Sequence, residues 1–137
     1  MTNSKIVIDA SIVIKWLVLQ REEKVAEARK VVQLLLQGKI QVWAPSFLLV
    51  EVTNILLKKK KMSIEVMDKA IQEIKKTGIQ FVDFDVSEIG KLTRLAVQHS
   101  LTTYDAMYLL IAKEKKIPLL TLDRQLLKIT DVCISLD

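Results

Sequence analysis

The sequence is poor in the side chains that bind soft metals, with a single cysteine, Cys133, and a single histidine, His99. One cysteine excludes an internal disulfide, and the absence of a cysteine and histidine cluster argues against a zinc site. Because disulfides belong mainly to oxidising compartments, a chain without them fits a reducing one. We therefore expect a cytoplasmic protein that does not depend on disulfides or zinc.

Long uninterrupted apolar runs are also missing. Charged residues break the apolar stretches well before they reach the length that spans a bilayer. The first residues, MTNSKIVID, lack the basic, apolar and small-residue order of a secretory signal peptide. We find no internal repeat, linker or low-complexity segment, so residues 1–137 are interpreted as a single domain without a membrane segment.

What the chain does have is apolar residues in abundance and a moderate excess of positive charge. Half of its 137 residues are hydrophobic, enough for a sizeable core. The formal net charge is +5, and the isoelectric point is near 9.3. A polyanionic partner would suit this charge, but many soluble proteins are mildly basic, so the charge alone does not identify a partner.

Short apolar segments alternate with segments of helical periodicity along the chain. The expected strands are residues 5–9, 41–44, 79–84, 118–121 and 132–136. The expected helices cover residues 11–18, 25–37 and 47–61, then begin at Ser63, Asp85, Thr102 and near Asp123. Such alternation predicts βαβ units, and hence a three-layer α/β/α sandwich around a mainly parallel sheet.

The segment LTTYDAMYLLIA at residues 101–112 combines an acid with a nearly all-round apolar helix. Thr102 is a candidate N-cap, and Asp105 follows it at capping-box spacing. The apolar residues that follow predict a buried, central helix. Taken alone, Asp105 is best interpreted as a cap. Three other acids at comparable places, Asp9, Glu51 and Asp123, favour a shared site instead.

The predicted topology places these acids at one edge of the sheet. Asp9 ends the first strand and Asp123 follows the strand that contains Thr121. Ligands of parallel sheets bind beyond the carboxyl ends of the strands, and the helices after them begin at the same edge. A structural alternative stays open, because Asp9 and Asp123 can each simply cap the helix that follows.

Glu51 is harder to explain by structure alone. Its helical neighbours Phe47, Leu48 and Ile55 are apolar, so the carboxylate lies on the face expected to be buried. A buried carboxylate needs a partner or a proton. A private ion pair, for example with Lys15, is one solution, and a shared acidic site with a cation is the favoured one.

Converging carboxylates repel one another unless a cation or protons intervene, and an all-oxygen ligand set favours Mg²⁺ or Mn²⁺. Ser11 and Thr121 either support such a site or bond only to local backbone. An acid-held divalent cation in a basic protein suggests phosphodiester hydrolysis by an activated water. Arg124 and Lys15 are the basic residues expected to contact substrate. The run of lysines at residues 58–61 is explained equally well as a solvated helix end and as a contact to a polyanion.

Four segments together resemble PIN-domain proteins, especially the VapC toxin ribonucleases of VapBC toxin–antitoxin pairs. They are DASIVIKW, APSFLLVEVTNIL, LTTYDAMYLLIA and PLLTLDRQL, and they span nearly the whole chain. The resemblance implies a PIN-like fold. It also implies that the family's metal-binding acids correspond to Asp9, Glu51, Asp105 and Asp123. Ser11 and Thr121 match its accessory polar positions.

The same resemblance implies an endoribonuclease that depends on Mg²⁺ or Mn²⁺, forms a homodimer and is inhibited by a small antitoxin protein. The alternative is a catalytically silent PIN-like module that binds RNA or protein. A phosphotransfer domain with an aspartyl phosphate ranks last, because Ala10 and Ser11 follow Asp9 where a second acid is needed.

Overall fold

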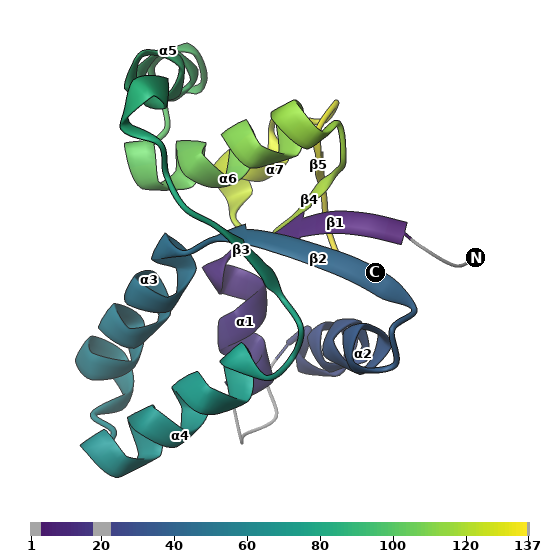
Figure 1. Ribbon diagram of the computed structural model, residues 1–137, viewed down its shortest axis with the longest axis vertical. Helices are drawn as coiled ribbons and strands as arrows, with labels where there is room; N and C mark the ends of the chain where they lie inside the picture. Colours follow the sequence, from purple (N-terminus) through teal and green to yellow (C-terminus); the bar gives the residue numbers. More distant parts are fainter. Residues whose placement is uncertain (1–3, 18–22, 137) are drawn as a thin grey trace.

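The fold is a five-stranded parallel sheet between two layers of helices (Figure 1). The computed structural model describes residues 4–17 and 23–136, without the side chains of residues 59 and 60. The strands are β1 (Ser4–Ile8), β2 (Ile40–Pro45), β3 (Gln80–Val82), β4 (Leu119–Leu120) and β5 (Cys133–Ile134), in the order β3-β2-β1-β4-β5. All four strand pairings are parallel. The predicted α/β/α sandwich is confirmed.

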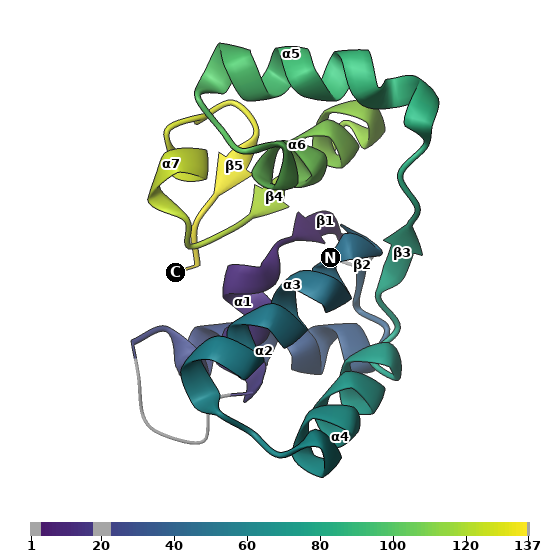
Figure 2. The same ribbon diagram turned by 90° about the vertical axis from the view of Figure 1, so that its left-hand side faces the viewer.

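The helices fall into two groups, one on each face of the sheet. One face carries α1 (Ala10–Leu17), α2 (Val25–Leu36), α3 (Phe47–Ile55) and α4 (Ile64–Lys75) (Figures 1 and 2). The other carries α5 (Ile89–His99), α6 (Thr103–Lys115) and α7 (Arg124–Leu127). A π-helical segment, η1 (Leu56–Lys60), continues α3, and a 3-10 turn, η2 (Val86–Glu88), precedes α5. None of the described helices has the length and apolar character needed to cross a membrane.

Helix α6 is the buried centre of its layer, as its nearly all-round apolar sequence predicts. It packs on β1, β2 and β4, while α5 lies outside it and covers its outer side (Figure 2). Its buried residues are Ala106, Tyr108, Leu109, Leu110, Ile111 and Ala112. Because both sides of the helix are covered, it needs no polar stripe along most of its length.

The strand register brings chemically important residues to one point. Val7 pairs with Leu119 and Ile8 pairs with Leu120, so the next residues, Asp9 and Thr121, emerge side by side at the carboxyl edge of the sheet. The strand residues before them are buried, which fixes the register, because a slip by one residue would turn apolar side chains out of the core.

Several element bounds differ from the sequence-based expectation. The expected strand 79–84 is only Gln80–Val82, because the chain then turns and the Asp85 carboxylate accepts a hydrogen bond from the Ser87 amide at the start of η2. The helix predicted for residues 47–61 changes to a π-helix at Leu56. The predicted end of the first helix, residue 18, lies outside the described residues.

Replacing Thr102 by alanine should lower the free energy of unfolding by about 1 kcal/mol. The Thr102 hydroxyl caps α6 by accepting a hydrogen bond from the Asp105 amide at 3.1 Å. Thr103→Ala, at the neighbouring exposed threonine, is the matched control and should change stability by less than about 0.5 kcal/mol. Urea unfolding measures both, and equal effects would contradict the capping role.

Candidate metal centre

Asp9 is the most buried acid of the site, with its side chain held from three directions. It follows the central strand β1 and is 5% exposed. Its Oδ1 accepts hydrogen bonds from the Ser11 amide at 3.1 Å and the Ser11 hydroxyl at 2.5 Å. Its Oδ2 accepts a bond from the Thr121 hydroxyl at 2.5 Å. The carboxylate therefore has a fixed orientation.

The two hydroxyls that hold Asp9 also bind the loop after β4. Ser11 Oγ accepts a hydrogen bond from the Leu122 amide at 2.9 Å, and Thr121 Oγ1 accepts one from the Asp123 amide at 2.9 Å. Each hydroxyl thus donates to a carboxylate and accepts from a backbone amide. Ser11 and Thr121 join the ends of β1 and β4 into one network, which is more than local backbone bonding.

Glu51 lies on α3, and its partner is a tyrosine. The Tyr108 hydroxyl, from the fully buried side chain on α6, donates to Glu51 Oε1 at 2.6 Å. Tyr108 lies in a run of apolar residues, and the sequence pattern does not predict its contact with Glu51. The available signal was that a buried tyrosine hydroxyl usually finds a hydrogen-bond partner. The contact joins the helix layers across the carboxyl edge of the sheet.

Asp105 and Asp123 complete the acidic group. Asp105 lies in the first turn of α6 and is partly buried. Asp123 precedes α7, and its Oδ1 accepts hydrogen bonds from the amides of Gln125 and Leu126 at 2.9 and 3.0 Å. Asp123 is therefore the cap of α7. Capping leaves Asp123 within electrostatic reach of Asp9, Glu51 and Asp105, so the two interpretations do not compete.

Burial and neighbouring acids raise the pKa of Asp9, Glu51 and Asp105. Burial, together with the charges of Glu51 and Asp123, raises the pKa of Asp9 to about 6, although hydrogen bonds from Ser11 and Thr121 work against the rise. Burial also raises the pKa of Glu51, opposed by the Tyr108 hydrogen bond and reinforced by Asp105 and Asp123.

The pKa of Asp105 is raised in the same direction, first by burial and then by Asp123. An ion pair with a lysine would have the opposite effect on Glu51, because a nearby cation lowers the pKa of a carboxyl. The charges that act on the pKa of Glu51 are those of Asp105 and Asp123.

The chemistry of the donor set fits a hard divalent cation. Every donor is an oxygen, from carboxylates with hydroxyls behind them, which suits Mg²⁺ or Mn²⁺. Among the described residues, no three acidic, histidine or cysteine side chains form a ready-made metal cage. Mg²⁺ commonly keeps several waters and bonds directly to only one or two carboxylates.

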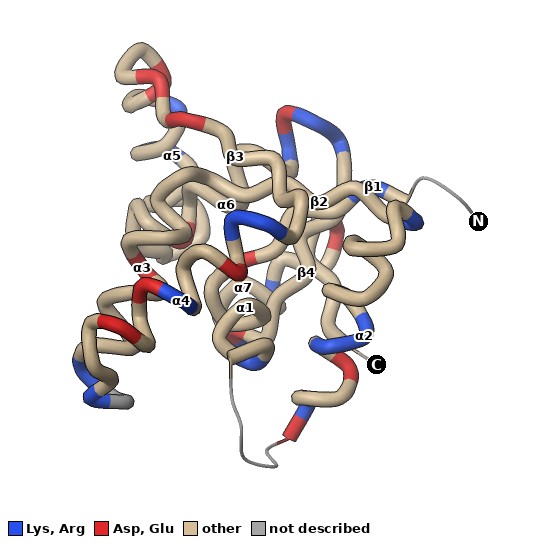
Figure 3. Tube along the Cα trace, turned by 60° about the horizontal axis from the view of Figure 1, so that its bottom comes forward, with Lys and Arg blue, Asp and Glu red and all other residues tan. Residues whose placement is uncertain are grey.

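The basic residues are spread around the molecule. Figure 3 shows lysine and arginine on most elements, interspersed with acids. Arg124 is exposed at the start of α7, directly after Asp123, and Lys15 is half-buried in the last turn of α1. The side chains of Lys59 and Lys60, within the predicted lysine run, lie outside the described part. Of the two residues expected to contact substrate, Arg124 directly follows Asp123, one of the four acids.

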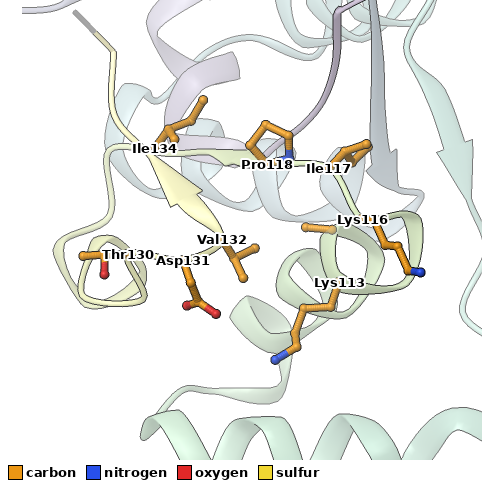
Figure 4. Close-up of a pocket in the computed structure, with 9 residues that line it drawn as sticks. Lys113, Lys116, Ile117, Pro118, Thr130, Asp131, Val132 and Ile134 are labelled. Atoms are coloured by element: carbon orange, nitrogen blue, oxygen red, sulfur yellow. The ribbon is translucent and has the colours of Figure 1, made fainter.

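Two hollows of similar volume differ in their relation to the acids. One, of about 460 Å³, has Glu51 in its wall together with Phe47 and Tyr104. The other, of about 440 Å³, lies where β4 and β5 begin, with Lys113 and Asp131 at its rim (Figure 4). The second contains none of the four acids and belongs to the opposite end of the strands, so the chemistry of the cluster is not located there.

The chain matches one family model and resembles several solved structures. A family model described as PIN domain matches residues 6–132. PAE2754 from Pyrobaculum aerophilum has a similar structure, with a TM-score of 0.68 and 20% identity over 98% of this chain and 92% of that one. A search of curated protein sequences finds no significant match.

Two further solved structures share the fold. A chain of VapBC2 from Rickettsia felis, bound to a DNA fragment from its promoter, has a TM-score of 0.69 and 12% identity over 97% of this chain and 99% of that one. VapC20 from Mycobacterium tuberculosis, described as a sarcin-ricin loop cleaving toxin, has a TM-score of 0.65 and 14% identity, covering 85% and 86%. At these identities the likeness establishes the fold.

In the absence of divalent metal, the free energy of unfolding should fall as the pH rises from 4 to about 6. The folded protein holds the Asp9 proton up to about pH 6, whereas an ordinary aspartate loses it near 3.8. The folded state therefore binds more protons in this range, and the difference corresponds to about 3 kcal/mol. Denaturant unfolding at each pH measures the effect.

Asp9→Asn should flatten this part of the pH profile, because it removes the titrating group and keeps the side-chain shape. Asp68→Asn, at an exposed acid on α4, is the control and should keep the wild-type slope. An Asp9→Asn protein that loses stability between pH 4 and 6 as steeply as the wild type would show that Asp9 is not the responsible group.

Proposed function

Because the chain belongs to the PIN domain family, we propose that it is an endoribonuclease that depends on Mg²⁺ or Mn²⁺ and serves as the toxin of a toxin–antitoxin pair. The observation that carries the proposal is the group formed by Asp9, Glu51, Asp105 and Asp123, in which burial and mutual repulsion raise the pKa of three members. Such an acidic group is suited to bind a divalent cation.

The proposed reaction is hydrolysis of an RNA phosphodiester bond. The oxygen of a water molecule bonds to phosphorus, one bridging phosphorus–oxygen bond breaks, and the departing oxygen takes up a proton. A divalent cation at the acids supplies neutralisation of phosphate charge and a lowered pKa of water. Without it, four carboxylates would repel a phosphate, which makes the requirement for metal part of the proposal.

The chain's own side chains have separate roles in this scheme. Asp9 is the fixed point, because Ser11 and Thr121 hold both of its oxygens. Tyr108 orients Glu51 by bonding to Oε1, and none of the described residues donates to Oε2. Glu51 is the proposed acceptor of a proton from the attacking water.

Substrate and partners follow from charge and from the named relatives. The net charge of +5 favours a polyanion, and Arg124 and Lys15 are the proposed contacts to its backbone. A similar fold occurs in a toxin described as cleaving the sarcin-ricin loop and in a VapBC assembly, which supports a small antitoxin as partner. We also propose a homodimer, in keeping with highly exposed apolar side chains such as Val86 and Val97.

Mn²⁺ or Mg²⁺ should stabilise the protein against unfolding. A cation that binds only the folded state at a concentration about 100 times its dissociation constant adds about 2.7 kcal/mol. Asp9→Asn and Asp105→Asn should lose most of this gain, while the exposed-site control Asp68→Asn should keep it. Denaturant unfolding with and without metal measures the effect, and equal gains in all four proteins would place the metal elsewhere.

The purified protein should cleave RNA when incubated with total cellular RNA and Mg²⁺ or Mn²⁺, and a chelator should prevent cleavage. Asp105→Asn should lower the rate by about 100-fold or more, because it removes one charge of the proposed metal site. Circular dichroism should show an intact fold. End mapping of the products identifies the cleaved bonds.

Full activity of Asp105→Asn at matched metal concentration would contradict the catalytic assignment. RNA binding by the wild type without any cleavage, in either metal, would favour the alternative of a silent binding module.

A further inference from the structure

A pair of stacked aromatic rings lies beside the acidic cluster and has no role in the reaction described above. The rings of Phe47 and Tyr104 are nearly parallel, 8° apart in plane, with centroids separated by 4.7 Å. Both line the hollow of about 460 Å³ that also includes Glu51. This volume is within the range of small-ligand sites.

The rings come from the same two helix beginnings that carry the acids. Phe47 is one helical turn before Glu51 on α3, and Tyr104 directly precedes Asp105 on α6. Phe47 covers one face of the tyrosine ring, yet the Tyr104 side chain remains 54% exposed. A large aromatic ring is therefore presented to solvent immediately next to two of the four acids.

We propose that this hollow is a subsite for one unpaired RNA base next to the cleaved phosphate, and that the base stacks on the exposed face of Tyr104. The inference rests on the proposed ribonuclease function and adds a stacking contact to one base of the substrate. Every base offers a flat π-face, and stacking on aromatic side chains is the usual way in which proteins hold unpaired bases. A base in a paired helix cannot reach such a platform.

The polar groups of the hollow suit a base edge. Asn54 is exposed and lies in the wall with Thr53. The asparagine amide offers both donors and an acceptor, as recognition of a base edge requires. Phe47, Glu51 and Asn54 are spaced four and three residues apart, so they lie along one stripe of the helix. Since none of the described lysines or arginines lines the hollow, a phosphate is not its expected occupant.

The test uses a short oligoribonucleotide that contains the bond mapped in the total-RNA digest. In a second set of oligonucleotides, each position on either side of that bond in turn carries a ribose without a base. Values of kcat/KM are measured for the wild type, Tyr104→Ala and Tyr104→Phe. The control is Val66→Ala, at an apolar residue of α4 with an exposure similar to that of Tyr104.

Tyr104→Ala should lower kcat/KM roughly 5- to 100-fold on the intact oligonucleotide, the range expected for loss of one base–aromatic stack. Tyr104→Phe keeps the ring and should keep the efficiency, as should Val66→Ala. At one position, removal of the base should slow the wild type by a similar factor and should slow Tyr104→Ala no further, because both changes remove the same contact. Metal-induced stabilisation of Tyr104→Ala should equal that of the wild type.

Two results would overturn the subsite. One is wild-type efficiency in Tyr104→Ala. The other is a set of losses that add at every abasic position, which would show that Tyr104 contacts none of the tested bases. If the wild type itself cleaves no RNA, the ribonuclease function fails first. If the wild type is active and Tyr104→Ala has the same kcat/KM, only the base subsite is contradicted.

Discussion

The structure depends on the burial of one carboxylate at the end of its central strand. Asp9 leaves β1 where the sheet is fully covered by helices, and Ser11 and Thr121 hold both of its oxygens. The same two hydroxyls accept hydrogen bonds from backbone amides of the loop after β4. A group that is costly to bury thereby becomes the junction of two parallel strands and the first residues of two helices.

Helices α3 and α6 place further site residues near Asp9. Tyr108 reaches from α6 to Glu51 on α3, so a hydrogen bond spans the edge of the sheet between the two helix layers. Asp105 and Tyr104 extend the same N-terminal turn of α6 toward solvent. One buried helix thus contributes a core side chain, an acid and an exposed ring within residues 104–108. Its apolar remainder anchors all three through packing on the sheet.

The acidic cluster illustrates where sequence reasoning reached its limit. From the sequence, capping a helix and belonging to the acidic cluster are alternative roles for Asp123. In the structure Asp123 caps α7 and also acts on the pKa of Asp9 and Glu51. Tyr108 was interpreted as an apolar core residue, since helical periodicity places a residue on a face and says nothing of what its hydroxyl meets across the sheet. The stacking of Phe47 on Tyr104 was missed for the same reason.

The sequence by itself determined the order of elements, the layered fold and the edge of the sheet at which the acids gather, because these follow from hydrophobic periodicity, capping residues and the direction of parallel strands. Only the tertiary structure decided which atoms meet. The pairing of Ile8 with Leu120, and the packing of α6 between the sheet and α5, are long-range consequences of core packing. They set the distances on which hydrogen bonds and pKa values depend.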